Sequence, residues 1–228
     1  METDISPLIV SLKTVLLSTL ITFIIGLLAA YFMANYRGRL KGLIDGILLL
    51  PLVLPPTVVG FLLLVVLGRR GPLGSLLYKL GIMIVFSWQA TVIAAVVVAF
   101  PMMYKTSKGA FEQLDHNLIN AARTLGISGV RIFLRISIPL AWPGIMAGGI
   151  LAFARALGEF GATIMLAGNI PGRTQTIPLA IYFAAAGGDE KSAYLWVALI
   201  IAISLAAVFA MNFWLEHQQR FISGRRRR

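Results

Sequence analysis

The sequence has no cysteine and few charged residues. The absence of cysteine among its 228 residues excludes disulfides, thiolate metal sites and cysteine nucleophiles. Only 13% of the residues are charged, whereas 58% are hydrophobic, and the mean hydropathy is +0.86. A soluble domain of this length needs a more polar surface. The composition therefore predicts an integral membrane protein.

Signals of catalysis and metal binding are also missing. No Gly-x-x-x-x-Gly-Lys-Ser/Thr loop is present, so we expect no ATP binding of that kind. No nucleophile–base motif is visible, and His116 and His217 lie too far apart in sequence to suggest a metal site. The net charge of +11 arises mainly from residues between apolar runs and at the C-terminus. This placement favours a role in membrane topology over nucleic-acid binding.

Five long apolar runs are present, and each has at least the roughly 20 residues that a helix needs to cross a bilayer. Strands of a membrane barrel would be shorter and would alternate in polarity, so we expect an all-α protein. The expected spans are residues 8–34, 43–67, 82–103, 138–157 and 193–215.

The second run carries three prolines, Pro51, Pro55 and Pro56. Each removes a backbone donor and clashes with the preceding turn. In lipid such a break requires neighbouring helices or a cavity that satisfies the freed backbone groups. A simple kink and a functional hinge fit this pattern equally well.

Lysine and arginine are distributed unevenly between the two sides of this arrangement. Thirteen fall in the segments after the first, third and fifth spans, and five in the segments after the second and fourth. The positive-inside rule makes the first side cytoplasmic. We therefore expect the N-terminus outside and the C-terminus inside, with Arg225–Arg228 as a cytoplasmic stop signal.

The long cytoplasmic loop 104–137 contains a helix–glycine–helix pattern. Leu118, Ala121, Ala122 and Leu125 repeat with helical spacing and predict one apolar face. Gly126 fits the left-handed position that ends a helix, and Ser128 can cap a second short helix. Such a unit suits docking into a groove of a cytosolic partner. It equally suits an amphipathic helix lying on lipid headgroups.

Arg155 and Glu159 lie four residues apart near the end of the fourth span and share a helix face. Charged residues at membrane depth usually face partners or cavities. The pair is either a structural ion pair or part of an anion pathway, and Gly158 and Gly161 permit a chain break there. The apolar segment 160–167 is too short to span and is expected to re-enter the protein or lie at the interface.

Small residues recur every fourth position along the fourth span. Such a stripe lets a second helix approach closely, and we expect packing within one subunit. The stripe comprises Gly144, Gly148, Ala152 and Ala156.

The stretch Asn120-Ala-Ala-Arg-Thr-Leu-Gly126, followed after nine residues by Ile-Ser-Ile-Pro139, resembles the EAA loop of bacterial ABC importer permeases. The family pattern is Glu-Ala-Ala, three residues, Gly, nine residues, Ile-x-Leu-Pro. Here Asn120 replaces the glutamate and Ile138 the leucine. The resemblance implies that this loop docks on an ATPase subunit through Asn120, Ala121, Ala122, Arg123, Leu125, Gly126 and Pro139.

Other segments resemble oxyanion permeases. Residues 152–162 are similar to a segment of sulfate and molybdate permeases, and residues 50–60, 68–71 and 168–178 are similar to segments of molybdate permeases. The resemblance implies an all-α integral membrane protein with a type I ABC importer permease (MetI-like) core. Its domain would cover residues 8–217, including the coupling loop 117–139, and a basic cytoplasmic tail would cover 218–228.

The resemblance further implies a permease subunit of an ATP-driven importer for molybdate in the bacterial cytoplasmic membrane. Sulfate, thiosulfate and tungstate are alternative substrates. The implied partners are a second copy of the chain, two copies of a cytosolic ATPase subunit that uses ATP and Mg, an outer (periplasmic) oxyanion-binding protein and membrane lipid. We expect no cofactor on this chain and no nucleic-acid partner.

An oxyanion pathway should offer hydroxyls, amides and helix N-termini. The residues proposed for it are Arg155, Glu159, Thr163, Thr57 and Asn169, with Thr174 and Gln175 as further hydroxyl and amide groups. We expect the binding protein to dock on residues 69–81 and 160–190. Rival hypotheses are an ATPase-independent channel or secondary transporter, a membrane-embedded lipid enzyme, and a scaffold.

Overall fold

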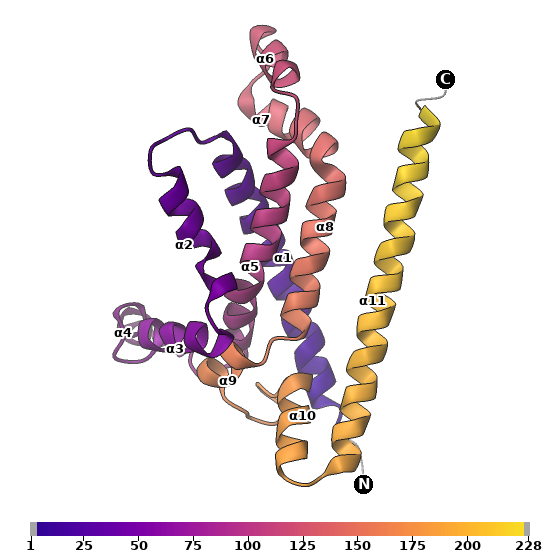
Figure 1. Cartoon of the computed structure of the whole chain (residues 1–228). Coiled ribbons are helices and arrows are strands. Elements are labelled where there is room, and N and C mark those ends of the chain that lie inside the picture. Colours follow the sequence, from indigo (N-terminus) through magenta and orange to yellow (C-terminus); the bar gives the residue numbers. More distant parts are fainter. Residues whose placement is uncertain (1–3, 226–228) are drawn as a thin grey trace. The chain divides into compact units, whose positions relative to one another are not determined.

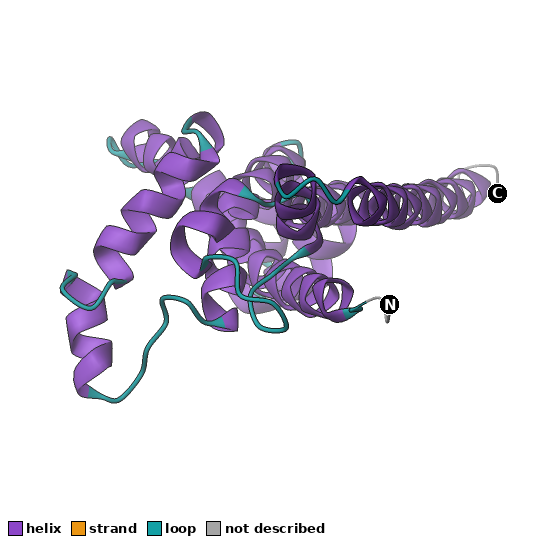
Figure 2. Cartoon of the chain, turned by 90° about the horizontal axis from the view of Figure 1, so that it is seen from below, coloured by secondary structure: helices purple, strands orange, loops and turns teal. Residues whose placement is uncertain are grey.

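The computed structural model describes residues 4–225, with side chains for residues 4–210. All secondary structure in this part of the chain is helical: Figure 1 labels the helices, and Figure 2 shows them in purple. The elements are α1 (Ser6–Asn35), α2 (Lys41–Val53), α3 (Pro56–Leu67), α4 (Pro72–Lys79), α5 (Trp88–Glu112), α6 (His116–Thr124), α7 (Gly129–Ile132), the π-helical η1 (Phe133–Ser137), α8 (Ile138–Leu157), α9 (Gly161–Ala167), α10 (Ile177–Ala186) and α11 (Glu190–Arg225). The chain divides after Thr176 into two compact units.

The first unit is built on the long helices α1, α5 and α8, which pack side by side. Small residues allow the close approach. A Cβ added at Gly144 would lie 2.5 Å from Ala110 Cβ, and one at Gly148 would lie 3.2 Å from Met103 O. Ala152 is fully buried and Ala156 nearly so. The prediction that the small stripe of α8 serves packing within one subunit is therefore confirmed.

Buried hydroxyls join α1 to α5. Thr14 Oγ1 and Thr91 Oγ1 lie 2.9 Å apart, and Trp88 Nε1 donates to Thr14 Oγ1 at 3.0 Å. Each polar group buried away from water needs such a partner. These bonds fix the register of the two helices near the start of α5.

The second expected span, residues 43–67, is not one straight helix. It consists of α2 and α3, whose axes are bent by 113°. Pro51 is accommodated inside α2, but Leu54 and Pro55 are extended, with ψ of 142° and 137°. A residue that precedes proline is disfavoured from the helical region, so the Pro55–Pro56 pair ends α2 and starts α3 anew. The described chain thus has four helices able to span a membrane, or five if the bent pair is one span.

The ends of two other spans also differ from the sequence prediction. The third starts at Trp88 rather than at residue 82, because Ser87 is extended and residues 82–87 are not helical, with a turn at 85–86. The fourth is longer than expected, since α7, η1 and α8 form one helical run from Gly129 to Leu157. The expectation that 160–167 does not span is confirmed: α9 has seven residues and is largely buried within the first unit.

The second unit contains α10 and α11. The two helices pack against each other and are joined by a tight turn in which Gly188 has φ of +78°. Asp189 Oδ1 accepts from Ser192 N at 3.2 Å at the start of α11. The expected fifth span lies within α11, and its side chains beyond residue 210 lie outside the described residues.

Candidate functional site

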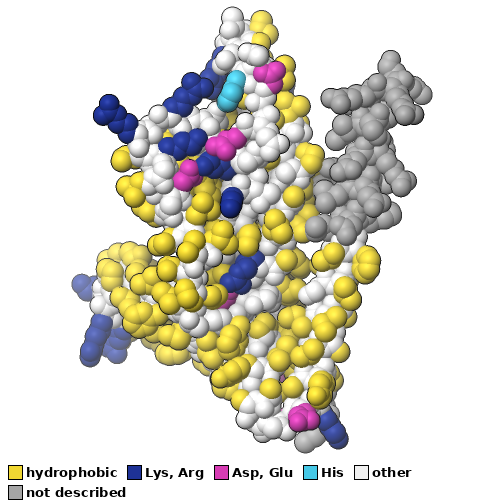
Figure 3. All heavy atoms as spheres, in the orientation of Figure 1, with side chains coloured by type: hydrophobic (Ala, Val, Ile, Leu, Met, Phe, Trp, Pro, Cys, Tyr) yellow, Lys and Arg dark blue, Asp and Glu magenta, His cyan; other side chains and the backbone are white. Residues whose placement is uncertain are grey.

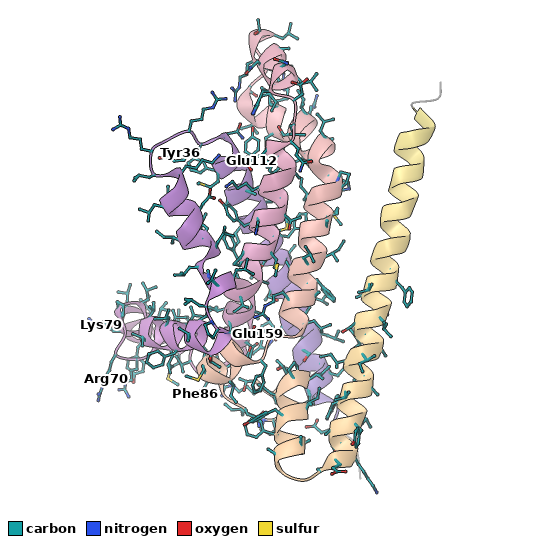
Figure 4. All side chains as sticks on the ribbon, viewed as in Figure 1. Tyr36, Arg70, Lys79, Phe86, Glu112 and Glu159 are labelled. Carbon is teal, nitrogen blue, oxygen red and sulfur yellow. The ribbon has the colours of Figure 1, made fainter. Side chains whose placement is uncertain are left out.

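The chain breaks between α8 and α9, and Glu159 organises the break (Figure 4). Its Oε1 accepts from Ala162 N at 2.7 Å, which satisfies one of the amide groups left open at the start of α9. Its Oε2 lies 2.8 Å from Arg155 Nη1. Glu159 is 3% exposed, so its charge requires this partner. The predicted i, i+4 ion pair is confirmed, and the capping bond is an addition that the sequence did not reveal.

The break between α2 and α3 lies against the break between α8 and α9. A Cβ added at Gly161 would lie 3.1 Å from Thr57 N, and one at Gly60 would lie 2.7 Å from the Cα of Ala162. The start of α9 therefore packs directly on the backbone of α3. Glycine at positions 60 and 161 permits this contact, because it places no side chain between the two short helices. The contact lies next to the prolines that interrupt the second span.

Four of the five residues predicted for an oxyanion pathway gather here. Arg155 lies in α8, Glu159 in the break and Thr163 in α9, and Thr57 lies against Gly161. Thr57 is exposed and Thr163 is buried. Asn169 is not part of the group, because it follows Gly168 at the other end of α9, roughly 10 Å away at 1.5 Å per residue.

A small cavity lies behind Glu159. Its volume, counted as the space open to the centre of a water molecule, is about 10 Å³. This is room for a single water and for nothing larger. Its lining residues are Ser11, Thr14, Val15, Ala95, Ala156, Leu157, Glu159, Thr163 and Thr176.

The helix–glycine–helix unit forms as predicted at its turn. Gly126 has φ of +75°, its amide donates to Arg123 O at 2.9 Å, and Ile127 N donates to Ala122 O at 3.1 Å. This pair of bonds is the Schellman motif. Ser128 occupies the cap position of α7 without a side-chain capping bond. Asp115, which was not predicted as a cap, caps α6 by accepting from Asn117 N at 2.8 Å.

The predicted apolar face of α6 does not lie on one side of the unit. Ala122, which was predicted to dock on the ATPase, is instead buried, and with Ile119 and Ile132 it forms a small core between α6 and α7. Leu118 and Leu125 are instead exposed, Leu125 by 79%. The chain folds back at Gly126, so α6 and α7 pack against each other. The apolar side chains on their remaining faces are therefore exposed. The exposed apolar residues are Leu118, Ala121, Leu125, Val130 and Leu134.

The remaining residues predicted for ATPase docking lie on the surface of the same unit. Asn120, Arg123 and Gly126 are exposed, as is Pro139 in the first turn of α8. Phe133 anchors the unit to the bundle, with its ring centroid 4.4 Å from that of Tyr31. Apart from Ala122, which is buried, and Pro139, which lies in α8, the residues predicted for docking thus lie together on the exposed α6–α7 unit (Figure 1, upper end).

A polar cluster joins α2 to the end of α5. Asp45 accepts from Tyr104 Oη, and its Oδ2 lies 2.5 Å from Lys108 Nζ. Glu112 lies 3.3 Å from Lys41 and 3.8 Å from Lys108. This cluster was not predicted from the sequence, although Asp45 is the one acidic residue in the second apolar run and a charge at membrane depth indicates a partner.

Among residues 4–210, whose side chains the structure describes, no group of three or more histidine, aspartate and glutamate side chains could hold a metal ion.

Comparison with known proteins gives the family. Residues 15–223 match the family model "Binding-protein-dependent transport system inner membrane component". The chain is 45% identical to the molybdenum transport system permease protein ModB of Escherichia coli K12 over 95% of each chain. It is 42% identical to the putative molybdenum transport system permease protein YvgM of Bacillus subtilis, over 94% of this chain and 93% of that protein.

A solved structure has the same fold. It is a bacterial alginate ABC transporter in complex with an alginate pentasaccharide-bound periplasmic protein. The TM-score is 0.75 at 18% identity, over 97% of this chain and 80% of that one. The all-helical permease fold is thus confirmed. The chain belongs to the family of inner membrane components of binding-protein-dependent transport systems.

Proposed function

We propose that this chain is the permease subunit of an ATP-driven importer of molybdate. The exposed α6–α7 unit supports the ATP-driven part of the proposal. It is a rigid element that presents apolar and small side chains on its surface, where an ATPase subunit can bind. The substrate follows from the high identity to molybdenum permeases along nearly the whole chain. Sulfate, thiosulfate and tungstate are the competing oxyanions.

The connections of the α6–α7 unit support a coupling role. Only three residues separate the end of α5 at Glu112 from the start of α6 at His116, and α7 continues through η1 into α8 without a gap. A displacement of the unit therefore acts on two membrane helices at once. We propose that ATP binding by two cytosolic ATPase subunits pulls these units together, and that hydrolysis, with Mg, occurs in those subunits.

We further propose that the pathway runs between two copies of the chain. Within the described residues, the cavity at Glu159 has room for one water molecule, far too little for a tetrahedral oxyanion. A second copy would supply the other wall of the path. Arg155, held by Glu159, would contribute positive potential beside it, and Thr57 would offer a hydroxyl.

The proposed topology follows the distribution of basic residues. The N-terminus lies outside and the C-terminus in the cytoplasm, and the α6–α7 unit then faces the ATPase. The outer binding protein would deliver substrate to the opposite face. The proposed domain is 8–217, followed by the tail 218–228.

Uptake of labelled molybdate tests the proposal. Cells that lack their own high-affinity importer would carry this chain with its ATPase and binding-protein partners. We expect ATP-dependent uptake that excess tungstate inhibits and excess sulfate does not. Equal inhibition by sulfate would replace molybdate with sulfate as substrate, and uptake without the ATPase would contradict the importer assignment.

A further inference from the structure

The tip formed by the end of α3 and by α4 carries three cations and no anion. Arg69, Arg70, Tyr78, Lys79 and Ser75 line an open pocket of about 670 Å³. No acidic residue occurs in the sequence between Asp45 and Glu112, so no carboxylate of the tip can neutralise these charges. Arg70 and Lys79 extend away from the helical bundle at this tip (Figure 4), where dark blue atoms gather in Figure 3.

The helix α4 is amphipathic. Leu73 and Leu76 lie on one face, Leu80 follows in the same register, and all three are more than half exposed. Ser75 and Lys79 lie beside this leucine face, with Arg69 stacked over the Tyr78 ring at 4.3 Å. A short helix with exposed leucines and cations beside them fits the boundary between acyl chains and headgroups.

The position of α4 is fixed by close backbone contact. A Cβ added at Gly74 would lie 1.9 Å from Gly68 O, and one at Gly71 would lie 2.2 Å from Val65 O. Both glycines are buried. The cations are therefore presented by a rigid element at the end of a membrane-embedded helix, and not by a free loop.

We propose that this basic tip binds the phosphate headgroup of an anionic phospholipid, with the leucines of α4 in the adjoining acyl region. The phosphate supplies the negative charge that the tip lacks, and the long stems of Arg70 and Lys79 reach from apolar surface to headgroup level. The exposed leucines favour lipid over a soluble binding protein. The outer binding protein would then dock on the segment after α9 and not on residues 69–81. The inference requires only that the chain is inserted in a membrane.

Native mass spectrometry of the full-length chain in detergent tests the inference, with dioleoyl phosphatidylglycerol and dioleoyl phosphatidylcholine as probes. We expect tighter binding of phosphatidylglycerol. The double variant Arg70→Gln/Lys79→Gln should lower its affinity roughly tenfold or more, at about 1 kcal/mol per basic residue. The swap Arg70→Lys/Lys79→Arg should retain it. The control Arg173→Gln/Lys191→Gln removes two charges elsewhere and should change the affinity less than twofold.

Four outcomes would overturn the proposal. The first two are an unchanged phosphatidylglycerol affinity in Arg70→Gln/Lys79→Gln and an equal loss in the control pair. The third is displacement of the lipid by molybdate or phosphate beyond the effect of chloride at equal ionic strength, which would identify a site for free oxyanions. The fourth is a loss of binding-protein affinity with lipid binding intact, which would identify a protein-docking surface.

Discussion

Lys108 Nζ lies 2.5 Å from Asp45 Oδ2, and this ion pair ties α2, the first half of the broken span, to α5, the helix that leads into the α6–α7 unit. Asp45 also accepts from Tyr104, which is fully buried in the bundle. Because α2 has no buried residue of its own, this polar contact is a main link between α2 and α5. Motion of α5 during coupling would thus be passed to the second span.

The first prediction concerns this pair. Lys108→Met and Asp45→Asn should each lower the thermal unfolding temperature in detergent, and a double-mutant cycle should give a coupling energy of about 1–3 kcal/mol. Lys41 and Glu112 form the matched control, because their side chains are 35% and 43% exposed against 16% and 19% for Lys108 and Asp45. The control pair should couple by about 1 kcal/mol or less. Equal coupling in the two pairs would contradict the assigned role.

Replacement of Glu159 should separate its two contacts. Glu159→Gln keeps an oxygen that can accept from Ala162 N but loses the ion pair with Arg155. Glu159→Ala loses both, and the missing cap alone costs about 0.5–2 kcal/mol. We expect the alanine variant to unfold at the lower temperature. If the glutamine variant is equally unstable, the ion pair and not the cap holds the break together.

Arg155 tests the oxyanion pathway. Arg155→Ala should reduce molybdate uptake strongly, whereas Arg155→Lys should keep part of it because a positive charge remains. Glu159 is left without a counter-charge in the alanine variant, so insertion and dimer assembly must be measured on the same preparations. Normal uptake by a correctly assembled Arg155→Ala variant would remove Arg155 from the pathway.

Gly126 tests ATPase docking. No atom lies within 4 Å of a Cβ added there, so a bulky residue meets no clash inside the chain, and only its φ of +75° is unfavourable. Gly126→Asn tolerates this backbone better than Gly126→Trp. We expect both to insert, and Gly126→Trp to lose ATPase co-purification and uptake.

The control for Gly126 is Gly129→Trp, which adds the same bulk in open space at a residue with no positive φ. It should be milder than Gly126→Trp if the Gly126 turn is the docking element. Full uptake in Gly126→Trp would count against the coupling role of the α6–α7 unit.

Two glycines of the broken span should respond in opposite ways to alanine. In Gly60→Ala the new methyl group would lie 2.7 Å from backbone of Ala162, so α3 and α9 must separate and stability must fall. Gly46→Ala adds a methyl group in open space within α2 and should be neutral or stabilising by up to about 1 kcal/mol. Thermal unfolding of both variants measures the contrast. Equal stability would argue against close packing of α3 on α9.

The class of this protein and its local features could be predicted from the sequence. Long apolar runs, helix spacing and the glycine and proline positions depend on near neighbours in the chain, so the spans, the Gly126 turn and the Arg155–Glu159 pair could be predicted. Features that depend on residues far apart in the chain appear only in the folded molecule. Tertiary packing bent the second span by 113°, placed Gly60 on Ala162 and Asp45 on Lys108, and turned Leu118 and Leu125 outward. Periodicity identifies an apolar face but not its neighbour, and only three-dimensional packing selects which of two apolar faces is buried.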